Sequence, residues 1–362
     1  MIRPVPAFII PLLVATALAA CSSADYQPAS AQLPAAAPVV ALVSKAAAPA
    51  ALEAQLAQTY RQLLPNKEGE LYAGAVAGTR IDDLAIAVVT VAGQVYSAGA
   101  AAVEFPLMSV SKPFTYAVAI EQQGVEAMLE KVGINATGMP YNSMSGLVSR
   151  PRPLQNPLVN TGAIATHSYI EGPSSAAKLQ RVIDVYSALA GRPLAVVDAW
   201  RATPRASSFA LAYQMQHYGL LAGDVDDALQ RYLLSNIVAV NVVDLARMGA
   251  TLANGGIRPD ADARVLEAAT VRTVLSAMVN AGMYEDSGLW WAEVGMPAKS
   301  GVSGAIVAIA PGWGAIAAYS PRLDGAGNSV RAGLAIRQLS RHWGLHSIDR
   351  LLATDELAPA TP

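Results

Sequence analysis

The amino-acid sequence predicts an α+β fold in which one antiparallel sheet is flanked by helices and carries an inserted helical lobe. Two pairs of apolar, β-rich segments lie far apart in the chain, and a short turn with glycine joins the members of each pair. The residues between the two pairs have mostly helical spacing. Hairpins on both sides of a helical middle are typical of a single sheet closed by elements from both ends of the chain.

Local patterns give the elements in chain order. Residues 51–64 have helical spacing of leucine and alanine. Residues 109–123 are predicted to form a helix that Gly124 ends, and Pro113 is tolerated because it lies in the first turn. The other predicted elements are a hairpin of 84–91 and 94–98, a mostly helical stretch over 176–275, a second hairpin of 304–310 and 315–320, and a last helix over 329–343.

Composition excludes several classes of protein. The chain has 362 residues, of which 53% are hydrophobic and 14% are charged, so it can bury a sizeable core. Its 25 basic and 27 acidic side chains give a net charge of -2, and we therefore expect no nucleic-acid partner. The one apolar stretch that approaches membrane length is at the N-terminus, which excludes a multi-pass membrane protein.

The N-terminus is predicted to be a signal peptide. Arg3 precedes an apolar run over 8–18, and the run closes with Leu-Ala-Ala-Cys21, which resembles the lipobox of bacterial lipoproteins. The resemblance implies cleavage before Cys21, lipidation of its thiol and a place in the cell envelope, as a periplasmic or outer-membrane lipoprotein. The alternative is an ordinary signal peptide with an incidental cysteine. Cys21 is the only cysteine, so an internal disulfide and a cysteine-based zinc site are both excluded.

Changes in amino-acid composition along the chain predict the domain organisation. Residues after Cys21 are mainly Ala, Pro, Ser and Val with hardly any charge, which is typical of a tether and cannot build a core. We predict a signal peptide over 1–20, a tether over 21–50, a catalytic domain over 51–350 and a tail over 351–362.

Ser109 and Lys112 are the first candidate catalytic residues. Three positions apart on a helix, they share one face, so that the amine can reach the hydroxyl. A serine becomes a good nucleophile only when a neighbouring base takes its proton. Burial would lower the pKa of the lysine amine and let it act as that base near neutral pH.

A second lysine motif strengthens this interpretation. Lys299-Ser300-Gly301 precedes the second hairpin, and a Lys-Ser-Gly strand facing a Ser-x-x-Lys helix is the arrangement of penicillin-recognising serine enzymes. The alternative is two unrelated lysines on surface elements. The pattern favours chemistry through an acyl-enzyme.

Five further segments follow one another along the chain: 156–164 (NPLVNTGAI), 248–256 (MGATLANGG), 281–284 (AGMY), 297–302 (PAKSGV) and 327–330 (GNSV). These segments resemble those of the serine-dependent glutaminases, which have a β-lactamase-like fold, and the resemblance is collinear from about Tyr60 to Leu345. It implies hydrolysis of glutamine to glutamate and ammonia through a glutamyl-serine intermediate, with no cofactor or metal.

The resemblance also assigns roles to single residues. Ser109 matches the nucleophile of the family and Lys112 its base, and Tyr284 is a third candidate catalytic residue because a phenol can relay a proton. Val302 matches the position whose backbone faces the substrate. The residues expected to contact substrate are Tyr72, Asn160, Ser208, Tyr232, Lys299 and Val302.

The chain differs from the family at positions expected to recognise the α-amino-acid part of the substrate. Arg201 stands where the family has a glutamate that answers the α-ammonium group of the substrate, and Ser208 replaces an asparagine. Met108 replaces the glutamine before the nucleophile. An arginine would repel an ammonium group, so the sequence leaves open a substrate that carries an extra carboxylate and no free amine.

Two other functions remain as alternatives. A binding lipoprotein that lost turnover would fit Arg201 and Ser208, but the chain retains both Ser109 and Lys112. A β-lactamase or penicillin-binding activity would fit the envelope location, but the five segments named above resemble those of glutaminases and not those of β-lactamases. The expected partners are a small amide substrate, the membrane through a lipid anchor only, and further copies of the chain in a homo-oligomer.

Overall fold

The computed structural model describes residues 49–136, 155–201 and 206–352. The predicted signal peptide, its Cys21 and nearly all of the predicted tether lie outside these residues, as does the chain from 353 onward. Among the described helices, none is both long and apolar enough to cross a bilayer.

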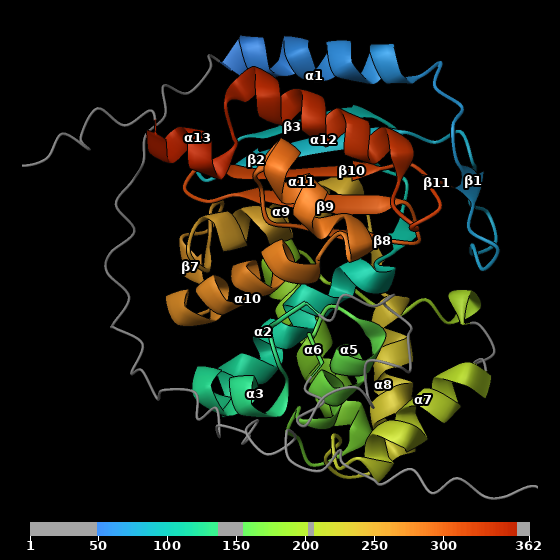
Figure 1. Cartoon of the computed structure of the whole chain (residues 1–362). Helices are drawn as coiled ribbons and strands as arrows, with labels where there is room; N and C mark the ends of the chain where they lie inside the picture. The colour runs from blue at the N-terminus through green and yellow to red at the C-terminus, as the bar shows by residue number, and fades with distance from the viewer. Residues whose placement is uncertain (1–48, 137–154, 202–205, 353–362) are drawn as a thin grey trace, which may run out of the picture. The chain divides into compact units, whose positions relative to one another are not determined.

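A five-stranded antiparallel sheet forms the centre of the fold, with the strand order β3-β2-β10-β9-β8 (Figure 1). Both predicted hairpins are confirmed, since β2 pairs with β3 and β9 pairs with β10. The Lys-Ser-Gly segment forms the edge strand β8, as the motif indicated. The strand bounds are β2 Ala85–Thr90, β3 Val95–Gly99, β8 Ala298–Gly301, β9 Ala305–Ala310 and β10 Gly314–Tyr319.

The inner strands are buried on both faces because alternate side chains enter two separate apolar clusters. In β2, Ala87 and Val89 belong to one cluster, whereas Ile86 and Val88 belong to the other. Strands covered on both sides read as continuous apolar runs, which is why these segments were recognisable in the sequence.

Helices cover each face of this sheet. On one face lie α1 (Pro49–Leu63) and α12 (Val330–Trp343), which also contact each other. On the other face lies α9 (Val242–Ala253), which packs against β2, β9 and β10 (Figure 1). The predicted first and last helices are therefore confirmed, and Ser329 caps α12 by accepting a hydrogen bond from the backbone N–H of Ala332.

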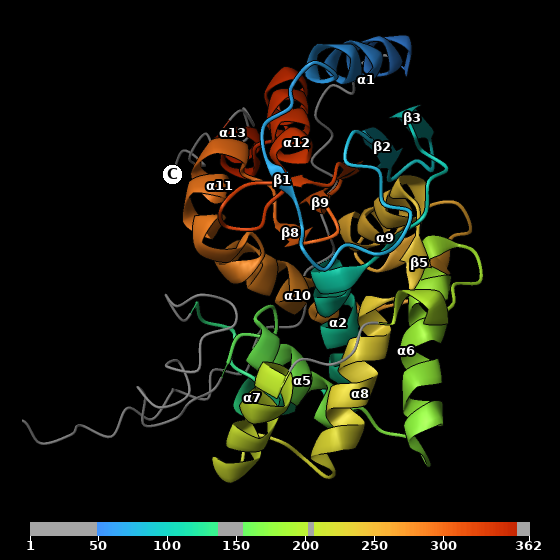
Figure 2. The same cartoon turned by 90° about the vertical axis from the view of Figure 1, so that its right-hand side faces the viewer.

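The helical lobe lies on the α9 side of the sheet and surrounds α2 (Ser111–Gln123), which carries Lys112 (Figure 2). Gly124 ends α2 as expected. The helices in and next to the lobe are α3 Val125–Lys131, α5 Asn160–Ser168, α6 Ser175–Ala190, α7 Ala206–His217, α8 Val225–Asn236 and α10 Ala268–Ala281.

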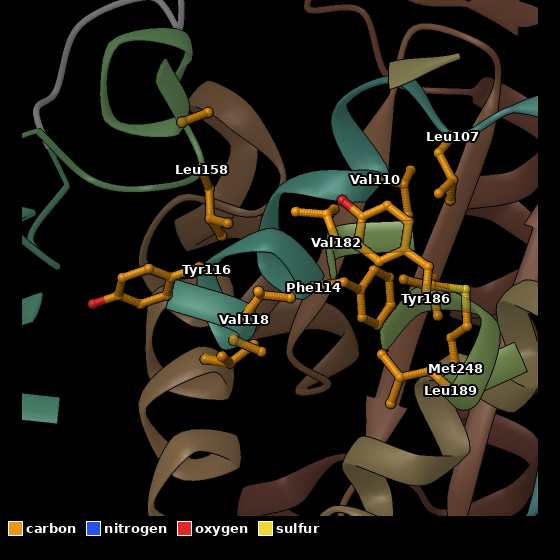
Figure 3. Close-up of a cluster of buried hydrophobic side chains, with 14 of the residues drawn as sticks. Leu107, Val110, Phe114, Tyr116, Val118, Leu158, Val182, Tyr186, Leu189 and Met248 are labelled. Atoms are coloured by element: carbon orange, nitrogen blue, oxygen red, sulfur yellow. The ribbon is translucent and has the colours of Figure 1, made fainter. Parts of the chain in front are cut away.

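An apolar core anchors α2 in this lobe. Phe114 and Tyr186 meet edge to face with ring centroids 6.3 Å apart, and Leu107 and Val110 pack beside them (Figure 3). The Tyr186 hydroxyl also donates to the backbone oxygen of Ser111 at 3.1 Å. The start of α2 is thus held by apolar packing and by a hydrogen bond to Ser111.

Short elements complete the fold, and two of them, η1 and α13, differ from the helices predicted from the sequence. Ser109 lies in a 3₁₀ turn, η1 (Met108–Val110), rather than in α2 itself. The helix α13 (Ser347–Leu352) was not predicted, and it spans residue 350, the predicted end of the catalytic domain. The remaining elements are β1 Glu70–Leu71, β4 Phe105–Pro106, η2 Asp198–Trp200, β5 Ala239–Val240, β6 Ile257–Arg258, β7 Ala263–Arg264, η3 Tyr284–Asp286, α11 Ser287–Val294 and β11 Arg322–Leu323.

Candidate active site

Ser109 sits on a sharp turn between β4 and α2. The residue before it, Met108, has a φ of 47°, a left-handed conformation that is uncommon outside glycine. The edge strand β8 approaches this turn closely, since a Cβ on Gly301 would lie 2.9 Å from Val110 Cγ2. The turn leaves Ser109 partly exposed while its neighbours Val110 and Ser111 are buried.

The hydroxyl of Ser111 holds the turn in place, which the sequence reasoning missed. It donates to the backbone oxygen of Met108 at 2.7 Å and lies 3.2 Å from Asn236 Oδ1. A second serine two positions after Ser109 was the available signal, because serine hydroxyls often bond backbone oxygens within one helical turn.

The Lys112 amine is in hydrogen-bond contact with the Ser109 hydroxyl. Lys112 Nζ lies 2.8 Å from Ser109 Oγ, so the predicted pairing across three residues is confirmed. Lys112 is 2% exposed, and burial lowers the pKa of its amine to about 7. A large fraction of the amine is therefore neutral near pH 7, when it can accept a proton.

Asn160 and Tyr232 complete the surroundings of this amine. Asn160 is the first residue of α5, and its Oδ1 accepts from Lys112 Nζ at 2.7 Å. The Tyr232 hydroxyl, on α8, donates to the same Oδ1 at 3.1 Å, and the Tyr232 ring lies 5.9 Å from Lys112 Nζ. Side chains from η1, α2, α5 and α8 thus converge on one point.

Tyr284 and Lys299 form a second buried group beside the first. The Lys299 amine lies 4.2 Å from the centre of the Tyr284 ring and donates to the backbone oxygens of Gly282 and Ser300, at 3.1 and 2.6 Å. Burial and the positive charge of Lys112 lower the pKa of Lys299 well below its usual range. Because Lys299 is fully buried and bound to backbone oxygens, it supports the Tyr284 turn, and the predicted substrate contact stays untested.

Tyr284 itself has an unusual backbone. Its φ is 55°, and its hydroxyl donates to the backbone oxygen of Ser300 at 3.3 Å. Val302 and Tyr284 both lie next to Gly327. A Cβ atom placed on Gly327 would be 3.6 Å from Val302 Cγ1 and 3.8 Å from Tyr284 Cε2. Left-handed conformations of non-glycine residues cluster at functional sites, and both Met108 and Tyr284 adopt one here.

Three of the predicted recognition residues, Tyr72, Ser208 and Arg201, lie outside the hydrogen-bond network around Lys112 in the described part of the chain. Tyr72 is half-buried in the loop after β1. Ser208 is half-buried on α7, and no hydrogen bond in the described parts of the chain joins either residue to Ser109 or Lys112. Arg201 pairs with Asp198 at 2.7 Å, and its side chain is 49% exposed. Its predicted position opposite a substrate ammonium group stays a prediction.

The grouping supports acyl transfer to a serine. A partly exposed hydroxyl touches a buried amine that can be neutral near pH 7, and this pairing can form and break an ester. Across the described ranges there is no cluster of three or more His, Cys, Asp or Glu side chains that could hold a metal ion.

Comparisons with known proteins place this chain in one family. The family model described as Glutaminase matches residues 70–348. A glutaminase from Colwellia psychrerythraea is 42% identical over 254 residues, covering 69% of this chain and 82% of that protein. A glutaminase from Corynebacterium efficiens is 40% identical over 282 residues, covering 76% of this chain and 66% of that protein.

Solved structures share the fold. One described as "probable glutaminase ybaS" has a TM-score of 0.80 and 36% identity, and it covers 83% of this chain and 99% of its own. The structure of Mglu in its glutamate form has a TM-score of 0.76 and 38% identity, and it covers 82% of this chain and 70% of its own.

Proposed function

The chain belongs to the glutaminase family and hydrolyses L-glutamine to L-glutamate and ammonia, and we propose that it does so through a covalent ester on Ser109. The observation that carries this mechanism is the 2.8 Å contact between Lys112 Nζ and Ser109 Oγ. An amine with a pKa of about 7 is matched to proton transfer near neutral pH.

In the first half of the reaction, the neutral Lys112 amine takes the Ser109 proton as Oγ attacks the side-chain amide carbon of glutamine. The tetrahedral intermediate then expels the amide nitrogen, which leaves as ammonia after it receives the proton from Lys112. The product on the enzyme is a γ-glutamyl ester of Ser109.

In the second half, water attacks the ester carbon while Lys112 accepts one of its protons. The ester bond breaks, the proton returns to Ser109 Oγ, and glutamate leaves. Tyr284 is suited to relay protons between Lys112 and the leaving nitrogen, and the backbone N–H of Val302 to bind the developing oxyanion. Asn160 and Tyr232 orient Lys112 and contact the substrate.

Ammonia release from L-glutamine by Ser109→Ala tests the mechanism. We expect turnover to fall by about ten-thousandfold or more, with thermal stability within about 1 kcal/mol of the parent. Ser276→Ala, which removes an exposed hydroxyl on α10, is the matched control. A glutamine-like diazo-ketone should label Ser109 in the parent alone, and residual serine-independent turnover would refute the proposal.

Arg201 favours a second activity at the same site. A guanidinium near the recognition end would disfavour a free α-ammonium group and tolerate an acylated one. We propose that α-N-acyl glutamines are also substrates, and that N-acetyl-L-glutamine is hydrolysed with a kcat/KM at least as high as that of L-glutamine. A much lower kcat/KM for the acetylated compound would exclude this second activity.

We further propose that the protein is a lipoprotein of the cell envelope, anchored at Cys21, and that the folded domain self-associates. The lipobox resemblance supports the first proposal, and the exposed aromatic side chains of Phe209 and Tyr213 on α7 support the second. Mass spectrometry of the mature N-terminus, with Cys21→Ser as the control, tests the anchor. Sedimentation of a protein that starts after Cys21 tests the self-association.

A further inference from the structure

A small cavity lies behind the turn that carries Tyr284. It has a volume of about 350 Å³ and is lined by Met283, Asp286 and parts of α11 and α12. Neither Ser109 nor Lys112 lines it, so it is separate from the acyl-transfer site. Its size is within the range of cavities that hold small molecules.

The wall of the cavity combines apolar and acidic side chains. Met283, Trp290 and Ile306 are buried apolar residues, and Leu289 is an unusual rim residue because 59% of it is exposed. The acidic side chains are Glu68, Asp286 and Asp324.

The charge of the cavity is negative. Arg337 is the basic residue in the lining; its Nη2 lies 2.6 Å from Glu293 Oε2, whereas its buried Nε has no hydrogen-bond partner among the described residues. The three carboxylates of the lining outnumber this one guanidinium. The carboxylate of Asp324 accepts hydrogen bonds from the backbone N–H groups of Ala326 and Asn328. Within the described ranges, Asp286 accepts one hydrogen bond, from Asn328 to its Oδ2, so its Oδ1 and the carboxylate of the exposed Glu68 are the acceptors that favour a cationic ligand.

Asn328 supplies the second indication of a ligand. It is 5% exposed and lines the cavity. Its Nδ2 donates to Asp286 Oδ2 at 3.1 Å and to the backbone oxygen of Met283 at 3.4 Å, whereas its buried Oδ1 has no hydrogen-bond partner. A buried acceptor without a donor is costly, and an N–H group of a ligand would satisfy it.

The same asparagine connects the cavity to the reaction site. Its two bonds hold the residues on either side of the Tyr284 turn, at Met283 and Asp286. Its neighbour Gly327 lies against the Tyr284 ring and Val302. The left-handed backbone of Tyr284 needs support from its surroundings, and Asn328 supplies part of that support by bonding Met283 and Asp286 on either side of it.

We propose that this cavity is an effector site for a small organic cation, a primary amine on an apolar body, and that its occupation raises turnover. The ammonium group lies between Asp286 and Asn328 Oδ1, and the apolar body packs on Leu289 and Trp290. A bound amine fixes the Tyr284 turn in the conformation seen here. The effector site uses the GNSV segment, which the catalytic mechanism leaves without a role.

Phenethylamine is the probe, with 2-phenylethanol as its neutral counterpart of similar shape. Calorimetry on the parent protein should give saturable binding of the amine and not of the alcohol. Asp286→Asn keeps an acceptor for Asn328 but removes the charge, and it should weaken amine binding by about tenfold. Glu285→Gln changes the charge on the same turn at a residue that does not line the cavity, and it should leave binding unchanged.

Two further measurements complete the test. Glu68→Gln, at an exposed residue, should weaken amine binding by a smaller factor even if Asp286→Asn does not fold. In the glutaminase assay, kcat should rise with amine concentration at the same midpoint as binding. Absence of saturable amine binding, equal binding of the alcohol, or binding with an unchanged or lower kcat would each overturn the proposal. Because calorimetry needs no turnover, failure of the effector site is distinguishable from failure of the catalytic mechanism.

Discussion

The side-chain oxygen of Asn160 lies 2.7 Å from the amine of Lys112, so the proposed base is held by a residue 48 positions away in the chain. The same oxygen accepts from the Tyr232 hydroxyl. Asn160 therefore fixes the direction of the Lys112 amine and stabilises its protonated form.

Replacing Asn160 with alanine should lower kcat/KM for glutamine by about tenfold or more. It should also move the acid limb of the pH profile to lower pH, because a lost acceptor disfavours the charged amine and lowers its pKa. The measurement is kcat/KM against pH. Asn280→Ala, at an exposed asparagine on α10, is the control, and an acid limb that moves to higher pH would contradict the assigned contact.

The pKa of Lys112, lowered by burial to about 7, predicts how activity depends on pH. Only the neutral amine accepts the Ser109 proton, so kcat/KM should rise as the pH increases through about 7. Lys112→Met should lower kcat by about a hundredfold or more at every pH. Lys112→Arg keeps the charge and cannot deprotonate, so it should be as inactive as Lys112→Met. A profile in the parent that is flat through neutral pH would exclude Lys112 as the base.

Arg201→Glu should raise kcat/KM for free L-glutamine severalfold, mainly through KM. The new carboxylate would attract the α-ammonium group that the arginine repels. Because the Arg201 side chain is 49% exposed, loss of its pair with Asp198 should change stability little. Arg181→Glu makes the same charge change at an exposed site on α6 and should leave KM unchanged. If both variants behave alike, Arg201 does not face the substrate.

Acid should destabilise the fold through His167. Burial, with a contribution from Arg231, lowers the pKa of His167 to about 3 from an ordinary value of 6.5. Between these two values the unfolded chain binds one more proton than the folded chain. The free energy of unfolding therefore falls as the pH drops through this window, by up to about 1.4 kcal/mol per pH unit.

His167→Gln removes this titration and should flatten the acid dependence of stability. Urea unfolding at neutral and at mildly acidic pH measures the effect. His217→Gln, at an exposed histidine on α7, should keep the dependence of the parent. An identical pH dependence in His167→Gln and the parent would show that other groups dominate acid unfolding.

Much of the fold could be predicted from the sequence because its signals are local. The strands β2, β9 and β10 are continuous apolar runs next to glycine-containing turns, and α2 ends at Gly124. The short helix α13 lacked such a signal. The strained backbone of Met108 and Tyr284 was also beyond sequence reasoning, because left-handed conformations are anticipated only at glycine.

Three features could be inferred from residues that are close together or in a fixed order along the chain: the antiparallel sheet, the pairing of Ser109 with Lys112 and the family resemblance. Long-range packing added the rest: Lys112 is buried, Asn160 and Tyr232 surround its amine, and Lys299 lies against the Tyr284 ring. The pKa of an amine depends on the water that packing removes and on the acceptors that packing supplies. Those come from segments far apart in the chain, and their meeting is a property of the folded protein.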